Sequence, residues 1–218
     1  MMYLHERHSV LMHLRNMLDV ALTTASGGNI SLRIRETGHI VISPTGIAYA
    51  DMTEEDVLVL DANGMRVDGR RLPSSELHMH LAVYRSRPDV CAIVHTHSPY
   101  ATTFACLREA IPAVHYLVGL AGSKVRVADY ATFGTRELAE NTVAALGDDN
   151  AVLLANHGLL AVGSELQAAF TVAEQIEFVA RLYYQSRCIG TPVVLNEEEM
   201  KEVFRKFRDY GRQPDARE

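Results

Sequence analysis

The chain has 218 residues, 48% of them hydrophobic and 22% charged, which is the composition of an ordinary globular protein. Its 21 Lys and Arg against 27 Asp and Glu give a net charge of −6, so no general electrostatic attraction draws it to nucleic acid or to an anionic membrane. It lacks a signal-peptide pattern, and no apolar run approaches the roughly 18 residues of a membrane span. Its three cysteines are too few and too far apart for a disulfide framework or a zinc site, and we expect buried or partly buried thiols. We therefore expect one domain over residues 1–218, a cytoplasmic location, and neither a nucleic-acid nor a membrane partner.

Residue patterns in the first half of the chain predict one helix, three short strands and a second helix. Apolar residues recur every three or four positions from Val10 to Leu22, which predicts a helix over about residues 3–23 that ends before Ser26-Gly27-Gly28-Asn29. Short apolar runs separated by turns then predict strands at residues 30–34, 39–42 and 57–60. The second helix starts at Pro73-Ser74-Ser75-Glu76, because serines can cap a first turn and a carboxylate there opposes the positive end of the helix dipole. It ends near Arg87-Pro88.

The second half of the chain mixes strands and helices. An apolar run predicts a strand at residues 91–95, whereas the apolar stretch at 113–118 has no clear type. Helical spacing predicts helices at residues 100–107, 135–146, 164–188 and 196–210. Two further apolar runs, at 151–154 and 159–162, predict strands joined by a tight turn at Asn156-His157-Gly158. This mixture predicts one α/β domain with a sheet covered by helices.

Two histidines, His95 and His97, lie one residue apart where the strand at 91–95 ends. Residues two apart in a strand project from the same face, so both imidazoles would aim at one point, as two ligands of a metal must. Taken alone, the pattern favours exposed or hydrogen-bonded histidines over a metal site. Further ligands must therefore come from elsewhere in the chain.

The best further candidates are His157 and Glu76. His157 lies in a turn between two apolar runs, where the end of a strand places a polar side chain at the rim of a sheet. By itself it could be a turn histidine bonded to a backbone carbonyl, and Glu76 could be a first-turn carboxylate that only stabilises its helix. Together, three histidines and a carboxylate suit a divalent transition metal, most simply zinc. His80 shares a helix face with Glu76, so we expect it beside these ligands rather than among them.

A glycine-rich segment precedes the first predicted strand. Gly27-Gly28-Asn29 matches neither of the common nucleotide-binding glycine patterns, and by itself it could be a turn that caps the first helix. Glycines also allow a close approach of the backbone, and several small neutral donors occur nearby in the expected fold. These donors would suit a phosphate group, and they are Asn29, Thr45, Gly46, Ser74 and Ser75.

Five motifs in order resemble those of the class II aldolase/adducin family. They are Gly28-Asn29-Ile30-Ser31, Ser43-Pro44-Thr45-Gly46, Pro73-Ser74-Ser75-Glu76, His95-Thr96-His97 and Asn156-His157-Gly158. The likeness runs from the first predicted helix to the last, and it includes Tyr130-Ala131-Thr132-Phe133-Gly134-Thr135. The resemblance implies a single-domain α/β fold with a central, mostly antiparallel sheet, and a homotetramer with active sites at subunit interfaces.

The resemblance also implies site residues and a reaction. The metal would be one Zn²⁺ per subunit, held by Glu76, His95, His97 and His157. The phosphate would bind at Gly28, Asn29, Thr45, Gly46, Ser74 and Ser75. Glu76 and Tyr116 would be catalytic, Tyr116 in the site of a neighbouring subunit, and the aldehyde would meet Phe133, Phe207 and Tyr210. The implied reaction is reversible cleavage of a phosphorylated sugar, a 1-phosphoketose such as L-fuculose 1-phosphate, through a metal-stabilised enediolate to dihydroxyacetone phosphate and a small aldehyde.

Other activities on the same scaffold remain open. Related epimerases resemble this pattern with aspartate at the position of Glu76, so glutamate favours aldol chemistry over epimerisation. The chain could also be an aldolase for another 1-phosphoketose, such as rhamnulose or 5-deoxyribulose phosphate, or a dehydratase or decarboxylase. An alternative of a different class is a non-catalytic adducin-like interaction module. Asn156 and Ser98-Pro99-Tyr100 depart from the aldolase pattern and leave the aldehyde specificity open.

Overall fold

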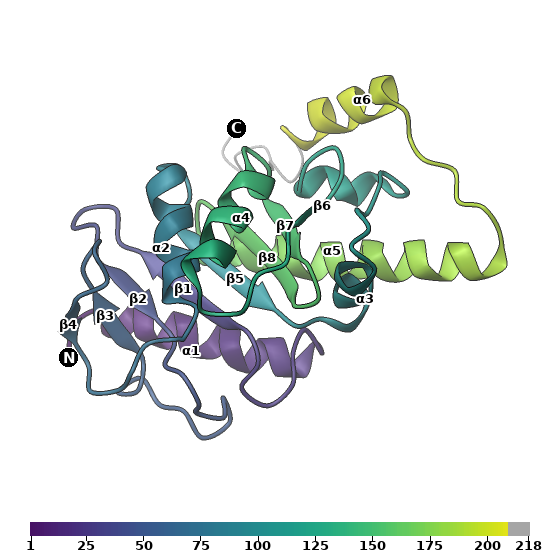
Figure 1. Ribbon diagram of the computed structural model, residues 1–218. Coiled ribbons are helices and arrows are strands. Elements are labelled where there is room, and N and C mark those ends of the chain that lie inside the picture. Colours follow the sequence, from purple (N-terminus) through teal and green to yellow (C-terminus); the bar gives the residue numbers. More distant parts are fainter. Residues whose placement is uncertain (209–218) are drawn as a thin grey trace, which may run out of the picture.

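The computed structural model describes residues 1–208, which form one eight-stranded sheet with helices on both faces (Figure 1). The strands are β1 Asn29–Arg33, β2 Ile40–Ile42, β3 Leu58–Leu60, β4 Arg66–Asp68, β5 Ala92–Thr96, β6 Arg126–Ala128, β7 Ala151–Leu154 and β8 Gly158–Gly163. The helices are α1 Leu4–Asp19, α2 Leu77–Ser86, α3 Pro99–Leu107, α4 Arg136–Leu146, α5 Leu166–Ile189 and α6 Glu197–Phe207, with a 3-10 helix, η1, at Tyr116–Leu120.

The strand order is β4-β3-β2-β1-β5-β8-β7-β6, and every neighbouring pair is antiparallel except β6 with β7. This arrangement confirms the predicted α/β fold with a mostly antiparallel sheet. The strands β1, β5 and β8 lie at the centre, and the motif histidines come from the ends of two of these strands. Figure 1 shows α6 apart from the sheet, where it contacts η1 after an extended connection from α5.

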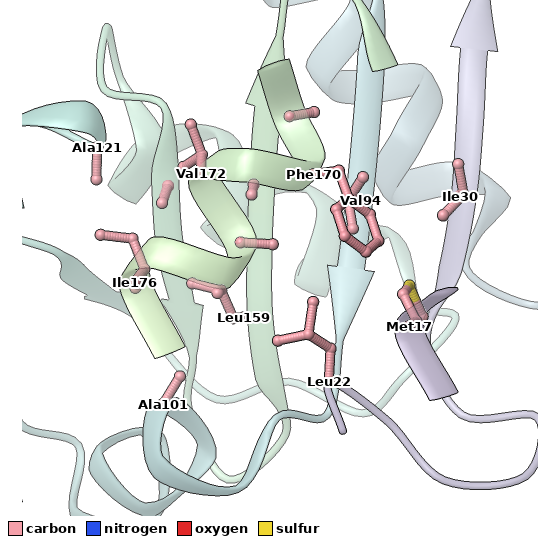
Figure 2. Packing of buried hydrophobic residues seen from close by; sticks show 14 of the residues in the cluster. Met17, Leu22, Ile30, Val94, Ala101, Ala121, Leu159, Phe170, Val172 and Ile176 are labelled. Atoms are coloured by element: carbon pink, nitrogen blue, oxygen red, sulfur yellow. The ribbon is translucent and has the colours of Figure 1, made fainter. Parts of the chain in front are cut away.

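Side-chain alternation along the strands feeds two separate cores. In β5, Val94 faces the core that α1, α3 and α5 cover, whereas Ile93 faces the core under α2 and α4. Figure 2 shows the first of these cores, where Phe170 and Ile176 of α5 pack with Val94 and with Leu159 of β8. Strands buried on both faces appear in the sequence as continuous apolar runs, which is why the central strands are predictable.

The first helix ends four residues earlier than predicted, at Asp19. The backbone N–H of Leu22 donates to Met17 O and that of Ala21 to Leu18 O, the two bonds of a Schellman cap, with Ala21 in the left-handed conformation at φ 57°. Leu22 is buried by this turn rather than by a further helical turn. Its apolar spacing therefore imitates a continuing helix.

Three other details differ from the prediction. The short strands β4 and β6 were not predicted, because β4 is exposed or half-buried and carries no apolar alternation, and β6 is a three-residue edge strand. The expected burial of the thiols is correct for Cys91 but wrong for Cys106 and Cys188, which lie on the outer sides of α3 and α5.

Among residues 1–208, no helix has the length and apolar character to cross a membrane.

Candidate metal centre

The register of the central strands brings the motif residues together. Asn29 of β1 lies directly opposite His95 of β5, so both side chains project from the sheet face that α2 covers. His97 follows two residues after His95 on the same face. His157 lies in the turn between β7 and β8, where Asn156 adopts the left-handed conformation at φ 54°.

Glycine is needed where two of these turns meet β5. A Cβ at Gly28, whose φ is 71°, would collide with the carbonyl oxygen of His95, and a Cβ at Gly158 would collide with that of Thr96. The glycine-rich segment and the turn after His157 can therefore lie directly against the strand that carries the two histidines. Tyr49 adds support, because its buried hydroxyl donates to the carbonyl oxygens of Gly27 and Gly28 at 2.9 and 2.7 Å.

Four side chains converge at one point, and their ligand atoms all lie within 4.8 Å of one another; they are Glu76, His95, His97 and His157. The Nε2 atoms of His95 and His97 are 3.1 Å apart. Glu76 Oε2 is 3.1 Å from His95 Nε2, and Glu76 Oε1 is 3.4 Å from His157 Nε2. The structure thus brings together all four residues that the sequence predicted as metal ligands.

This cluster fits a divalent cation. Glu76 Oε1 is buried and has no hydrogen-bond partner among residues 1–208, which is costly unless something else satisfies it. His95 Nδ1 lies 2.9 Å from Leu159 O and donates to it, so in the neutral form of His95 the lone pair of Nε2 points into the cluster. Three imidazole nitrogens and a carboxylate oxygen are a donor set typical of zinc and related transition metals.

The electrostatics of the metal-free cluster favour the metal-binding forms of Glu76, His97 and His157, whereas His95 is biased toward its protonated form. Burial acts to raise the pKa of the Glu76 carboxyl, but the nearby His95 and His157 and the hydrogen bonds from His95 and Asn29 outweigh it, so the pKa is lowered. Burial and the neighbouring His95 lower the pKa of both His97 and His157 to about 4. For His95 burial acts to lower the pKa, yet the Glu76 carboxylate raises it overall. At neutral pH, His97 and His157 are therefore neutral and Glu76 is ionised.

A cavity of about 380 Å³ adjoins the cluster, and Glu76, His97 and His157 form part of its wall. All six residues predicted to bind phosphate line this cavity, namely Gly28, Asn29, Thr45, Gly46, Ser74 and Ser75. Two loops are tied together beneath them, because Thr45 N donates to Leu72 O and Ser74 N to Ser43 O, both at 3.1 Å. The wall therefore combines a metal-ligand cluster with neutral donors on fixed loops.

Glu76 is held at the start of α2, where it is the N-cap residue rather than part of the first turn. Its backbone N–H donates to Ser74 Oγ at 3.2 Å, and its Oε2 accepts from Asn29 Nδ2 at 2.9 Å. Its side chain is only 6% exposed. The alternative of a simple exposed first-turn carboxylate does not describe this geometry.

Of the aromatic residues predicted to act on or contact the aldehyde, one lines the cavity and two described ones do not. Phe133 lines the cavity and is 65% exposed, and Tyr130, which was not predicted, lines it as well. Tyr116 and Phe207 lie outside the described lining, and their rings are 6.1 Å apart where η1 meets α6. Tyr210 falls outside the described residues.

The sequence did not predict that Arg108 and Tyr130 lie next to Asn156 at the site. Asn156 lines the cavity, and its Oδ1 accepts from Arg108 Nε at 3.0 Å. The guanidinium of Arg108 also lies 5.8 Å from the centre of the Tyr130 ring. Arg108 and Tyr130 are far from Asn156 in sequence, so no local pattern could have grouped them.

The fold and the cluster define an α/β protein with a candidate metal-ligand site next to a cavity that both polar and aromatic side chains line. A sequence profile described as "Class II Aldolase and Adducin N-terminal domain" matches residues 9–184. The chain belongs to this class II aldolase and adducin family, as its motifs predicted.

Three similar proteins make the class more precise. The chain is 49% identical over 208 residues to a 5-deoxy-D-ribulose 1-phosphate aldolase of Bacillus thuringiensis serovar kurstaki, covering 95% of this chain and 98% of that one. It is 42% identical over 197 residues to an L-fuculose phosphate aldolase of Escherichia coli strain K12, covering 89% and 90%. A solved structure of an L-fuculose 1-phosphate aldolase superposes with a TM-score of 0.92 at 45% identity, covering 94% and 96%. The protein is accordingly an enzyme of the class II aldolases, which are metal-dependent lyases.

Proposed function

We propose that the protein is a zinc-dependent aldolase that reversibly cleaves a 1-phosphoketose, L-fuculose 1-phosphate in the first place, to dihydroxyacetone phosphate and L-lactaldehyde. One observation carries the proposal: a single cavity contains both parts of the expected site. Three members of the cluster, Glu76, His97 and His157, form one side of its wall, and hydrogen-bond donors from three loops form another. A phosphate bound at Ser74 and Ser75 would leave the adjoining carbonyl and hydroxyl groups of the sugar facing the cluster. A cytoplasmic location remains a prediction.

The phosphate end of the site relies on neutral donors. Asn29 supplies a side-chain amide, Ser74 and Ser75 supply hydroxyls next to the start of α2, and Thr45 and Gly46 supply exposed backbone and side-chain groups. The N-terminus of α2 adds the positive end of its dipole, which favours an anion at this place. In the described residues, no lysine or arginine side chain lines the cavity, so binding would depend on these dipoles.

Glu76 would act as the acid and base of the reaction. Zinc would supply Lewis-acid stabilisation of the negative charge that the substrate oxygens acquire when the carbon–carbon bond breaks. Glu76 is ionised and lies in the cavity wall, so it can accept a proton from the donor carbon of dihydroxyacetone phosphate and return it. Asn29 keeps hold of one carboxylate oxygen while the other turns toward the substrate.

Tyr116 would act across a subunit boundary. Its side chain is 48% exposed and lies outside the described lining of its own chain's cavity. We propose a homotetramer in which Tyr116 enters the neighbouring site and handles the proton on the aldehyde oxygen. Phe133 and Phe207 would enclose the aldehyde, and Tyr210, the third residue predicted there, lies outside the described residues.

A second substrate has its own support, because the 49% identical relative is named for 5-deoxy-D-ribulose 1-phosphate. This sugar and L-fuculose 1-phosphate share the phosphate end and a terminal methyl group, and they differ by one CHOH unit in the aldehyde released. Ala131 and Phe133 in the cavity wall suit a methyl group in both cases. Asn156, fixed by Arg108, is the polar group of the wall best placed to read the extra hydroxyl.

A substrate panel tests the proposal. The zinc-loaded protein is given L-fuculose 1-phosphate, 5-deoxyribulose 1-phosphate and L-rhamnulose 1-phosphate, and release of dihydroxyacetone phosphate is followed by a coupled reduction. We expect the highest kcat/KM with L-fuculose 1-phosphate, and a higher value with 5-deoxyribulose 1-phosphate selects the second substrate. Release from none of the sugars contradicts the aldolase proposal, and zinc-free protein of unchanged behaviour would favour an adducin-like module.

A further inference from the structure

A completely buried histidine, His80, lies behind the candidate metal centre and takes no part in the mechanism above. It is 0% exposed and lies on α2, one turn after Glu76. Its ring is not among the four converging ligands. Such a residue is costly to bury unless both ring nitrogens are satisfied, so its partners indicate its role.

Both nitrogens of His80 have close partners on strand β1. His80 Nε2 is 2.5 Å from Asn29 Oδ1, and His80 Nδ1 is 2.6 Å from Ser31 Oγ. Asn29 Nδ2 is in turn 2.9 Å from Glu76 Oε2, and Ser31 Oγ is 2.8 Å from the Tyr84 hydroxyl. A continuous chain of hydrogen bonds therefore runs from Tyr84 through His80 to the carboxylate of Glu76.

The direction of each bond in this chain follows from the carboxylate at its end. An ionised Glu76 only accepts, so Asn29 must turn its NH₂ group toward Glu76 and its carbonyl oxygen toward His80. That oxygen also only accepts, so the proton of His80 must be on Nε2. His80 Nδ1 then accepts from the Ser31 hydroxyl, and Ser31 accepts from Tyr84.

The opposite orientation of the Asn29 amide would be unfavourable at Glu76, and also at His80 as long as His80 keeps its proton on Nε2. A flipped amide would place its oxygen against Glu76 Oε2, and its NH₂ group against the N–H of His80. Two acceptors would then face each other at one contact and two donors at the other, inside a buried site. Glu76 thus selects the orientation of Asn29, and His80 in its Nε2–H form is the buried partner that stabilises the selected orientation.

We propose that His80 is a positioning residue, which holds the Asn29 amide so that it donates to Glu76 Oε2 and leaves its second N–H for the cavity. This inference deepens the proposed function, and its kinetic part rests on that function. Because Asn29 also lines the cavity, His80 controls a contact shared by the carboxylate and the phosphate end of the site.

Two substitutions of similar size separate positioning from packing. In His80→Gln the terminal amide reaches the place of Nε2 and can still donate to Asn29. In His80→Asn the shorter side chain reaches only the place of Nδ1, so it keeps the Ser31 contact and loses Asn29. We expect His80→Asn to lower kcat by about tenfold or more and Zn²⁺ affinity by about tenfold, whereas His80→Gln stays within about threefold of the original protein in both.

A double-mutant cycle tests whether the effect passes through Asn29. In an Asn29→Ala background, His80→Asn should change Zn²⁺ affinity by less than about twofold, because the amide that His80 orients is gone. Equal behaviour of His80→Asn and His80→Gln, or a full effect of His80→Asn without Asn29, overturns the proposal. Zn²⁺ affinity is measured by competition with a chromophoric chelator, so this result holds even if no phosphoketose is cleaved and the proposed function fails.

A measurement on the unaltered protein covers the case in which a variant does not fold. In ¹⁵N-histidine-labelled, zinc-loaded protein, long-range ¹H–¹⁵N spectra report which ring nitrogen carries the proton. We expect His80 as the Nε2–H tautomer. Its ring signals are those missing from the spectrum of His80→Gln or, failing that, those of the solvent-protected ring that does not bind Zn²⁺, because His80 and His95 are the two described histidines with 0% exposure. A proton on Nδ1 would show that His80 cannot donate to Asn29 and would overturn the proposal.

Discussion

At the residue scale, Glu76 combines burial, negative charge and an unsatisfied oxygen. Its Oε2 is bonded to Asn29, whereas its Oε1 faces His157 Nε2 at 3.4 Å and has no hydrogen-bond partner among the described residues. A buried carboxylate with one fixed and one free oxygen can bind a cation and also exchange a proton. This combination places Glu76 at the centre of the proposed chemistry.

Glu76→Gln should abolish most of the proton exchange and leave the fold intact. A neutral amide has the same shape but cannot serve as the base, so we expect exchange of the donor-carbon proton of dihydroxyacetone phosphate to fall by about 100-fold or more. The exchange is followed by NMR in D₂O, and urea unfolding verifies the fold. Glu54→Gln, which changes a half-buried carboxylate paired with His8 outside the cluster, is the control and should exchange normally. Exchange near the original rate in Glu76→Gln would remove this residue from the role of base.

Local patterns in the sequence predicted the four converging side chains and the loops beside them, but not the long-range contacts that support them. His95 and His97 follow from strand alternation, and His157 follows from a turn between two apolar runs. Tyr49 contacts the glycine-rich segment, and Arg108 contacts Asn156. In both pairs the partners are far apart in the sequence, so the contacts depend on tertiary packing. Local periodicity carries no information about such contacts.

At the element scale, helix α3 begins directly after the histidine strand and is capped from another helix. Ser98 is its N-cap residue but makes no side-chain cap bond, and Pro99 follows it. Instead, the carboxylate of Glu177 in α5 accepts from the backbone N–H groups of Tyr100 and Ala101, each at 2.8 Å. This long-range cap holds the segment that leaves His97.

Glu177→Ala should therefore destabilise the protein through α3. Loss of an N-terminal cap costs about 0.5–2 kcal/mol, and the lost carboxylate also opposed the helix dipole, so we expect a fall of about 1–2 kcal/mol in the free energy of unfolding. Chemical denaturation measures it. Glu174→Ala removes a neighbouring carboxylate of α5 that has no bond to α3, and it should cost less. An equal loss in both variants would contradict the capping role.

Element boundaries were less predictable than the elements themselves. The end of α1 depends on a Schellman cap with Ala21 at its left-handed position, where glycine is the usual residue, so no sequence signal marked it. The strands β4 and β6 pair at the outer edges of the sheet, and three residues carry too little periodicity to be recognised. The long helix α5 and the central strands were predictable because core burial imposes their pattern.

At the scale of the whole molecule, the candidate metal centre gathers histidines of different burial on one face of the sheet. His80 and His95 are buried and His157 is half-buried, whereas His97 is exposed overall but turns its Nε2 toward His95. Burial lowers the pKa of His80 to about 3 and of His97 and His157 to about 4, whereas Glu76 raises that of His95. In an unfolded chain these groups titrate near 6.5. Between pH 6.5 and 4, the unfolded state therefore binds more protons at three of these residues and the folded state binds more at one.

The metal-free protein should consequently lose stability as the pH falls. Because the unfolded state binds more protons in this window, the free energy of unfolding decreases from about pH 6.5 toward pH 4, and the lowered pKa of Glu76 continues the trend below about pH 4.5. After removal of metal with a chelator, we expect Tm at pH 5 to lie about 5 °C or more below its value at pH 7. Circular dichroism measures the transition. A Tm that is constant or rises over this range would contradict the assigned protonation states.

The proposed sharing of active sites between subunits makes a quantitative prediction for mixed tetramers. The structure places Glu76 and His97 in the same cluster of one chain, whereas Tyr116 lies outside the described lining of that chain's cavity. Glu76→Gln and Tyr116→Phe should each be nearly inactive alone. In a randomly assembled ring of both, a site is complete when its own chain retains Glu76 and the neighbouring chain retains Tyr116, which occurs in about a quarter of the sites.

Coexpression of Glu76→Gln with Tyr116→Phe should therefore restore about a quarter of the original kcat per chain. Coexpression of Glu76→Gln with His97→Ala is the matched control and should restore nothing, because both defects fall in the cluster that a single chain supplies. Native mass spectrometry confirms that hybrids form and gives their proportions. Hybrids without recovered activity would show that Tyr116 does not complete the site of a neighbour. A group of the same chain would then have to handle the proton on the aldehyde oxygen. Tyr130, which lies in the cavity wall, is the candidate for that role.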